Sequence, residues 1–438
     1  MAVIAFASAC SSAAAGVGSA ENADAPSAEP YALHAQLTYV EQETSPFHAP
    51  YRGANSLSPD EGRQTFDATL YAGARLWSGA EAWINGEIDQ GFGLDATLGV
   101  AGFPSGEAYK VGRKRPYLRL PRAFVRQEWD RGGDSVDVSP DQNQLAGRVE
   151  SDRIVVTVGK FAVGDIFDAL RLAHDPRSDF FNWSAVDAST FDYAADAWGY
   201  TVGAAVEDYV GDWTLRGALF DLSNVPNSPH LDPGGHQFQA VAELERRFRF
   251  SGQAGKALLT LYESRARMGL LQAAIDQAQS TGAAPDVAAV RQYRGRSGLH
   301  LSIEQSVSAD LGLFARIGAA SGNVEAYEFT DVDRSLAIGA SLQGNRWGRG
   351  ADAVALAVLV NRASAVRQAY LNDGGLGILI GDGRLPHPGA EQIAEGYYSL
   401  GLGEHVHLTL DVQRIINPAF NRDRGPVSVF ALRLHAAI

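Results

Sequence analysis

The side chains best suited to bind a polar solute fall at alternate positions of one predicted strand, at Arg122, Phe124, Arg126 and Glu128. Alternate residues of a strand point to the same side of a sheet, so these four share a face. Guanidinium and carboxylate groups can hydrogen-bond to hydroxyls in place of water, while an aromatic ring can cover an apolar C–H surface. Three charges on one face of one strand are hard to place anywhere except beside water.

Glycines and histidines elsewhere could suggest a cofactor or a metal. The glycine-rich stretches 374–377 and 381–383 lack the spacing of a dinucleotide-binding loop and precede no credible helix, so we interpret them as turns. His405 and His407 share a strand face, but no third ligand is apparent nearby. We therefore expect neither a cofactor nor a metal site.

Carboxylates two residues apart, such as Glu87 and Asp89 or Glu243 and Glu245, also point the same way. We interpret them as parts of a polar wall rather than as catalytic dyads. No Ser-His-Asp arrangement has a local signature, and we expect no catalytic residue. An enzyme on the same scaffold stays an alternative, because a triad need not be contiguous in sequence.

The stretch from Asp67 to Asp89 shows what kind of element carries these residues. It reads as two strands joined by the turn Ser78-Gly79. One face is uncharged, and the other is dense in ionisable groups; the uncharged set in the first strand is Ala68, Leu70, Ala72, Ala74 and Leu76. A soluble sandwich could show the same alternation, so the repeat along the chain has to decide.

Runs of period-two alternation predict about sixteen strands. Their ranges are 33–41, 66–77, 80–90, 119–129, 153–161, 199–208, 212–220, 237–248, 256–264, 297–306, 311–319, 334–343, 352–361, 396–403, 406–415 and 427–438. Short and long connections alternate, as the periplasmic turns and extracellular loops of an outer-membrane barrel do. The segment 130–152 is long where a short turn is expected, which indicates strand extensions or a periplasmic excursion. Loop 265–296 carries an apolar stripe at helical spacing and predicts a short amphipathic helix on the rim or folded inward.

The uncharged face persists from strand to strand, as in Leu299, Leu301 and Ile303. A charge on a lipid-facing position costs about 2–4 kcal/mol at the membrane midplane, so hydrocarbon would impose this pattern. The predicted fold class is therefore all-β, a transmembrane antiparallel up-and-down barrel with short periplasmic turns and long extracellular loops. Trp77 and Trp129, at strand ends, are predicted to lie at the membrane interface.

Composition and the N-terminus agree with an exported barrel. The net charge of -14 argues against a nucleic-acid partner. Residues 1–20 are small and apolar and are predicted to be the remnant of an export signal, with 21–32 a disordered lead-in and 33–438 the barrel. Cys10, inside that first segment, is the single cysteine, which excludes thiolate chemistry in a processed chain.

Several motifs resemble the carbohydrate-selective porin family, the OprB-like porins of Gram-negative outer membranes. They are 191–193 with 196–200, 211–216 with 219–223, 310–316, 331–334, 346–349, 370–371 with 374–377, 395–398, and 411–413 with 417–418. The resemblance extends from about Leu33 to the end of the chain. A departure is the terminal Ile438, where such proteins usually end on an aromatic residue.

The resemblance implies passive, sugar-preferring diffusion of mono- or oligosaccharides across the bacterial outer membrane. The implied partners are sugars as permeating solutes and outer-membrane lipid and lipopolysaccharide, and the chain is either a monomer or a homotrimer. From the face pattern, the predicted pore-lining residues are Arg75, Trp83, Asn85, Glu87, Arg122, Phe124, Arg126, Glu128, Arg216 and Arg316. Alternatives are a channel for other small or anionic solutes, an export pore, or an outer-membrane enzyme or adhesin.

Overall fold

The computed structural model describes residues 29–110 and 112–438, and within them sixteen antiparallel strands close into one barrel. The strands are β1 Tyr31–Thr44, β2 Gly62–Trp77, β3 Ala80–Gly91, β4 Arg113–Val138, β5 Gly147–Phe161, β6 Thr201–Val210, β7 Trp213–Asp221, β8 Phe238–Phe250, β9 Gln253–Met268, β10 Gln292–Ser306, β11 Leu311–Ala320, β12 Arg334–Gln343, β13 Ala353–Arg362, β14 Glu391–Gly401, β15 Val406–Ile416 and β16 Val427–Ala437. Each strand pairs with its sequence neighbours, and β1 pairs with β16 to close the sheet. Closure leaves no unpaired edge, as a membrane-spanning sheet requires.

The helical segments of the described chain are short and lie in the connections. They are α1 Trp183–Val186, α2 Leu271–Thr281 and α3 Ala365–Asn372, with 3-10 turns η1 Leu94–Thr97, η2 Glu107–Lys110, η3 Val163–Asp165, η4 Val287–Val290, η5 Gly344–Trp347 and η6 Pro418–Phe420. None of the helices in this part of the chain is long and apolar enough to cross a membrane.

The two faces of the barrel wall are inverted relative to a soluble protein. Outward side chains are large and apolar, and Ile338 and Leu356 are 55% and 67% exposed. Inward side chains are polar and enclosed, and Glu395 and Asp411 are each 2% exposed. Alternation along each strand produces both faces at once, so the predicted transmembrane barrel is confirmed.

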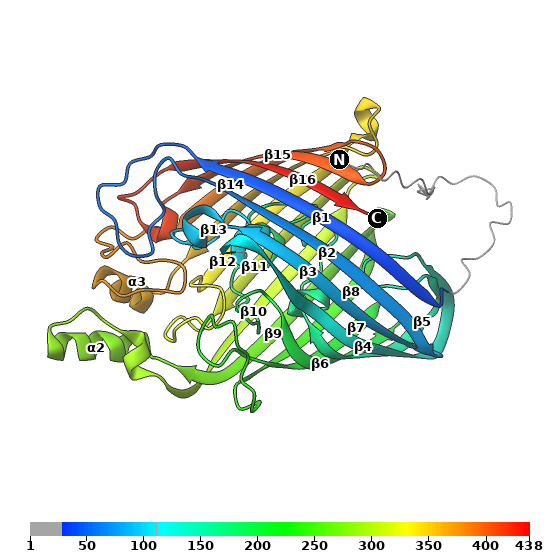
Figure 1. Ribbon diagram of the computed structural model, residues 1–438, viewed down its shortest axis with the longest axis horizontal. Helices are drawn as coiled ribbons and strands as arrows, with labels where there is room; N and C mark the ends of the chain where they lie inside the picture. The colour runs from blue at the N-terminus through cyan, green and yellow to red at the C-terminus, as the bar shows by residue number, and fades with distance from the viewer. Residues whose placement is uncertain (1–28, 111) are drawn as a thin grey trace.

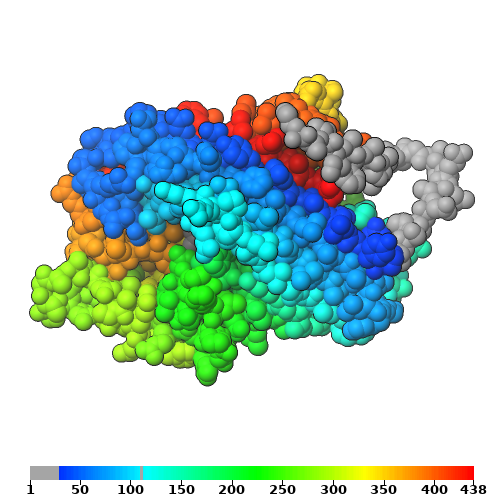
Figure 2. All heavy atoms as spheres, viewed as in Figure 1, coloured from blue at the N-terminus to red at the C-terminus, as the bar shows by residue number. Residues whose placement is uncertain are grey.

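The two ends of the barrel differ in the length of their connections. Two-residue turns such as Ser78-Gly79 and Ser251-Gly252 lie at one end, beside the start of β1 and the end of β16. Long connections gather at the other end, which carries α2 and α3 (Figure 1). The blue loop between β1 and β2, the orange segment with α3 and the yellow-green α2 lie together at that end (Figure 2). Short turns mark the periplasmic end and long loops the extracellular end.

Two features left open by the sequence are visible in the structure. The segment 130–152 is mostly strand, because β4 continues to Val138 and β5 begins at Gly147. The helix expected within 265–296 is α2, and it lies among the extracellular loops beside α3 rather than inside the barrel. The predicted export signal at 1–20 and most of the lead-in at 21–32 lie outside the described residues.

Candidate functional site

Residues 162–200, here called the inward loop, connect β5 to β6 but run inside the barrel. Arg316 of β11 is 2% exposed and lies beneath this loop. It donates from Nε to Asp168 Oδ2 (3.1 Å) and through its Nη atoms to the carbonyl oxygens of Ala185 (2.6 Å) and Ala173 (2.7 Å). One buried guanidinium therefore binds the loop at three separated points.

Two strands on another part of the wall hold the middle of the inward loop. Arg433 of β16 donates to the carbonyl oxygens of Pro176 (2.7 Å) and Ser178 (2.8 Å). Glu395 of β14 accepts a hydrogen bond from the amide of Phe181 (2.6 Å). Wall side chains thus satisfy backbone groups that would otherwise be buried without partners, and this fixes the loop inside the lumen.

The loop between β3 and β4, residues 92–112, packs beside the inward loop. Glu391 of β14 accepts from the amides of Ala101 (2.9 Å) and Gly102 (2.7 Å). The amide of Gly106 donates to the carbonyl oxygen of Phe181 in the inward loop (2.8 Å). Two loops joined to each other and to the wall fill much of the lumen and leave a narrow space along β2, β3 and β4.

That narrow space is a cavity of about 320 Å³, here called the constriction. The barrel wall and the inward loop both contribute to its lining, which includes Tyr71, Asp89 and Arg122 from the wall and Asp165, Arg177 and Tyr200 from the loop. A cavity of this size has room for a small sugar together with water. The side chains that face it are dominated by guanidinium, carboxylate and phenol groups.

Paired charges form the centre of the constriction. Arg122 donates from Nε to Asp165 Oδ2 (2.8 Å) and from Nη2 to Asp165 Oδ1 (2.6 Å), a bidentate pair between wall and loop. Arg119 donates to Glu87 and Asp89 of β3. Pairing holds these side chains in place, while guanidinium donors and carboxylate lone pairs remain for a solute hydroxyl.

Aromatic rings stand next to these charges. The guanidinium carbons of Arg119 and Arg122 lie 5.1 and 5.0 Å from the ring centroid of Tyr200. Trp198 donates from Nε1 to the hydroxyl of Tyr117 (3.0 Å). Polar groups that bind hydroxyls and rings that cover C–H faces thus occur together, as recognition of a sugar ring requires.

Carboxylates outnumber guanidinium groups around the constriction. Among the described lining residues there are five carboxylates, Asp89, Glu107, Asp165, Asp175 and Asp187, against three arginines, Arg119, Arg122 and Arg177. Burial raises the pKa of Asp187 to about 6, whereas the Arg122 guanidinium, acting against the effect of burial, lowers the pKa of Asp165. At neutral pH the formal charge of this lining is therefore negative.

A larger cavity of about 860 Å³, here called the vestibule, lies on the periplasmic side. Its lining includes Arg75, Arg126, Glu128, Arg153 and Arg216. Asp165 lines both the vestibule and the constriction, so the Arg122–Asp165 pair lies between the two cavities.

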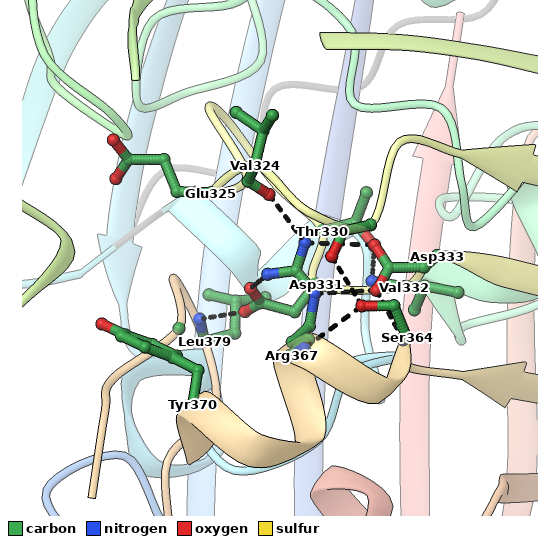
Figure 3. Close-up of polar contacts among 12 residues, drawn as sticks. Val324, Glu325, Thr330, Asp331, Val332, Asp333, Ser364, Arg367, Tyr370 and Leu379 are labelled. Carbon is green, nitrogen blue, oxygen red and sulfur yellow. Dashed lines mark hydrogen bonds and ion pairs between the residues drawn. The ribbon is translucent and has the colours of Figure 1, made fainter. Parts of the chain in front are cut away.

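A cluster centred on Arg367 holds the extracellular loops together (Figure 3). Arg367 of α3 donates from Nε to Asp333 Oδ2 (2.9 Å), from Nη1 to Asp331 Oδ1 (2.8 Å) and from Nη2 to the carbonyl oxygen of Val324 (3.1 Å). A cavity of about 270 Å³ adjoins the cluster and is lined in part by Tyr370. Because one guanidinium joins α3 to the loop 321–333, these loops form a fixed extracellular surface.

Comparison with known proteins assigns this arrangement to a family. Residues 54–437 match the model described as "Carbohydrate-selective porin, OprB family". The chain belongs to this family. It is therefore an outer-membrane porin for sugars, and the resemblance and location predicted from the sequence are confirmed. Both family and fold indicate a channel rather than an enzyme.

Solved structures support the fold. The high-pH structure of Pseudomonas putida OprB superposes with a TM-score of 0.71 at 16% identity, covering 93% of this chain and 94% of that one. The outer-membrane channel DcaP of Acinetobacter baumannii gives a TM-score of 0.51 at 10% identity, covering 93% of this chain and 97% of that one. A search of curated proteins found no match.

The ten residues predicted to line the pore all lie on strands of the porin but differ in their surroundings. Arg122 lines the constriction, and a second group lines the vestibule, namely Arg75, Arg126, Glu128 and Arg216. Glu87 is 0% exposed and pairs with Arg119 and Arg177 behind the constriction. Arg316 lies under the inward loop, so we interpret it as an anchor of that loop.

The other three predicted residues are enclosed by side chains. Trp83 and Phe124 are 2% and 6% exposed and belong to an apolar cluster with Tyr71 and Leu145. Asn85 is 0% exposed, and nothing in its surroundings explains its polarity. Among the described residues no group of three or more His, Cys, Asp or Glu is placed to hold a metal ion.

Sequence reasoning missed several residues of the constriction. Arg119 and Arg122 are three residues apart, so a regular strand would place them on opposite faces. Both face inward because the pairing of β4 with β3 shifts between Asn85 and Glu87. Asp165 and Arg177 belong to a loop whose entry into the barrel has no local signal. Trp198 and Tyr200 were within a family motif, which was the one available indication of their position.

Proposed function

We propose that neutral mono- or small oligosaccharides diffuse passively through the constriction into the vestibule, past the Arg122–Asp165 pair. The observation that carries this proposal is that Asp165 lines both cavities. Wall and loop face each other there through paired charges with Tyr200 beside them. Hydrogen bonds exchanged for hydration are weak in net terms, so a sugar can enter this site and still leave it.

The charge of the constriction supports neutral solutes over anions. Five carboxylates against three arginines among the described lining residues create a field that repels negative solutes. The alternative of an anion channel on the same barrel is therefore less well supported. Liposome swelling tests the choice: glucose should enter faster than gluconate, and equal or reversed rates would contradict the proposal.

Removal of the Arg122 side chain should weaken sugar binding in the passage. Arg122→Ala deletes charge-assisted donors, each worth about 1.5–3 kcal/mol, so the glucose concentration that halves the ion current should rise about tenfold or more. Current block in planar bilayers measures this concentration. Arg148→Ala is the matched control, because Arg148 lines the vestibule and pairs with Asp137 at the exposed periplasmic end. Equal glucose block in the two variants would refute a role for Arg122.

The preference for cations over anions should depend on pH through Asp187. Its pKa of about 6 means that the negative charge is present above pH 6 and is lost as pH falls below it. The constriction then loses the negative charge of Asp187, and the reversal potential in a KCl gradient should move toward lower cation preference between pH 7.5 and 5. Asp187→Asn should show a smaller shift; an unchanged shift in that variant would exclude Asp187 as its source.

We also propose that outer-membrane lipid and lipopolysaccharide contact the outward face. Trp77 and Trp213 are 61% and 46% exposed and lie at the periplasmic ends of β2 and β7. Trp129 is 52% exposed and lies within β4, level with the periplasmic turn Ser78-Gly79. Aromatic side chains of this kind favour the interface between hydrocarbon and water.

A further inference from the structure

One periplasmic connection differs from its neighbours. The turns at 78–79, 211–212 and 251–252 have two residues, whereas β4 and β5 continue to a hairpin tip at 139–146. Residues 131–152 are here called the periplasmic hairpin. The hairpin does not form part of the barrel wall, because β4 pairs with β3 only before residue 131 and β5 pairs with β6 only after residue 152.

The periplasmic hairpin bends where it leaves the wall. Pairing between β4 and β5 shifts register between Asp130 and Gly132 and again between Gly132 and Ser135. Gly132 and Gly133 have φ of +110° and +93°, values that residues with a side chain rarely adopt. Two glycines at a double bulge redirect the strands away from the line of the barrel wall.

Beyond the bend, the tip returns to the inner wall. Gln142 donates from Nε2 to Gln36 Oε1 on β1 (2.7 Å), and Gln36 is 4% exposed. Arg126 of β4 donates to the carbonyl oxygen of Asn143 (3.0 Å). Leu145 is 3% exposed and packs in the apolar cluster of Tyr71, Trp83 and Phe124. The tip is thus held by polar contacts and by apolar burial.

The chain that leads into β1 closes over the tip. The amide of Glu29 donates to the carbonyl oxygen of Ala146 (3.1 Å), and the amide of Ala146 donates to Glu29 Oε2 (2.8 Å). Arg75 donates to the carbonyl oxygens of Glu29 (3.2 Å) and Ala146 (3.3 Å). These reciprocal bonds fix the base of the tip at the periplasmic opening.

The position of the tip relative to the cavities suggests its role. Gln142 and Asn143 line the constriction, whereas Gln144 and Leu145 line the vestibule. We propose that the tip, residues 139–146, forms a second narrowing of the passage on its periplasmic side, which limits ion current and the size of the sugar that passes. This inference rests on the sugar pathway proposed above. It assigns the periplasmic boundary of the constriction to the periplasmic hairpin rather than to an extracellular loop.

Shortening the hairpin tests the proposal. Replacing residues 131–152 by Asn-Gly joins the paired positions Asp130 and Arg153 through a two-residue turn. Because current follows the width of the narrowest segment, single-channel conductance should rise on the order of twofold. Liposome swelling with raffinose should rise relative to swelling with glucose. In the matched control, residues 345–351 are replaced by Asn-Gly; this turn between β12 and β13 is almost wholly exposed, and its loss should leave both quantities unchanged.

Each outcome separates the two proposals. A parent that passes neither ions nor glucose overturns the passage itself. If the unmodified protein conducts, but its conductance and its swelling rate with raffinose equal those of the shortened variant, the hairpin proposal alone is overturned. Should the shortened variant fail to insert, Gln142→Ala with Asn143→Gly removes the two side chains from the constriction and keeps the hairpin. A smaller rise in conductance then supports the narrowing, and a parental value overturns it.

Discussion

Replacing Arg316 by alanine should turn a channel of fixed conductance into a wider channel with frequent current steps. Arg316 is buried and binds Asp168 together with three backbone carbonyls of the inward loop, at Ala173, Ala185 and Val186. Its removal leaves the Asp168 carboxylate buried without that cation, and breaking such a pair costs about 3–5 kcal/mol. The packed conformation of the inward loop would lose this much stabilising free energy, while the hydrogen bonds between strands keep the barrel wall closed.

Single-channel recording measures the result, and Arg265→Ala supplies the control. Arg265 is on the outer face of β9, where its side chain is 49% exposed and pairs with Glu263. The control should keep parental conductance and a quiet trace. Parental behaviour in Arg316→Ala would show that the inward loop does not depend on this anchor, and the interpretation of Arg316 would then be wrong.

A charge introduced on the outer face should destabilise the protein by an amount that depends on the depth of the substituted residue in the membrane. Ile338 is near the centre of β12, 55% exposed, and is paired with Ala315 and Val358 of the neighbouring strands. Ile338→Arg places a guanidinium at a hydrocarbon-facing position and should lower the free energy of unfolding in lipid vesicles by about 2–4 kcal/mol. Tryptophan fluorescence during urea titration follows this unfolding.

The same strand offers a matched control. Leu342 is on the same face, one residue from the periplasmic end of β12, and Leu342→Arg should cost only about 0–1 kcal/mol. The chain itself already carries Arg334 at the extracellular end of this face. Equal losses for the two variants would mean that the outer face does not meet a hydrocarbon layer of changing depth.

The barrel could be predicted from the sequence because its physical cause is local. The pattern Leu336, Ile338, Ala340 against Ser335, Ala337, Gly339 repeats every second residue, and water and hydrocarbon select the two faces separately. The same parity placed Arg122 and Arg126 on the inner face. Each of these inferences needs only the neighbours of a residue along one strand.

The constriction could be predicted only in part because its causes are distant along the chain. Asp168 and Arg316 are 148 residues apart, and nothing near either one shows that the loop enters the barrel. A single bulge reverses parity between Arg119 and Arg122, which hides Arg119 from a count of alternate residues. The anomaly at 130–152 was visible as excess length, yet its bend depends on the left-handed φ of Gly132 and Gly133.

The strands and the connecting segments of this porin therefore have different roles. The strands provide a closed wall whose polarity follows from sequence period alone. The inward loop, the loop 92–112 and the periplasmic hairpin narrow the lumen, and buried charges such as Glu391, Glu395 and Arg433 hold the two loops. Substitutions on the outer face of the wall should affect stability, whereas substitutions in the narrowing elements, or in the inward-facing wall residues that bind them, should affect current and solute preference.

The ion current of the purified protein in a planar bilayer, with glucose added in steps, shows whether the barrel is a water-filled channel that binds sugar. We expect a stable single-channel conductance that glucose reduces in a dose-dependent way, because ions and sugar share the passage beside Arg122 and Asp165. A protein that inserts and gives no conductance, or conducts without any response to glucose, would contradict a water-filled barrel narrowed by a sugar-binding constriction.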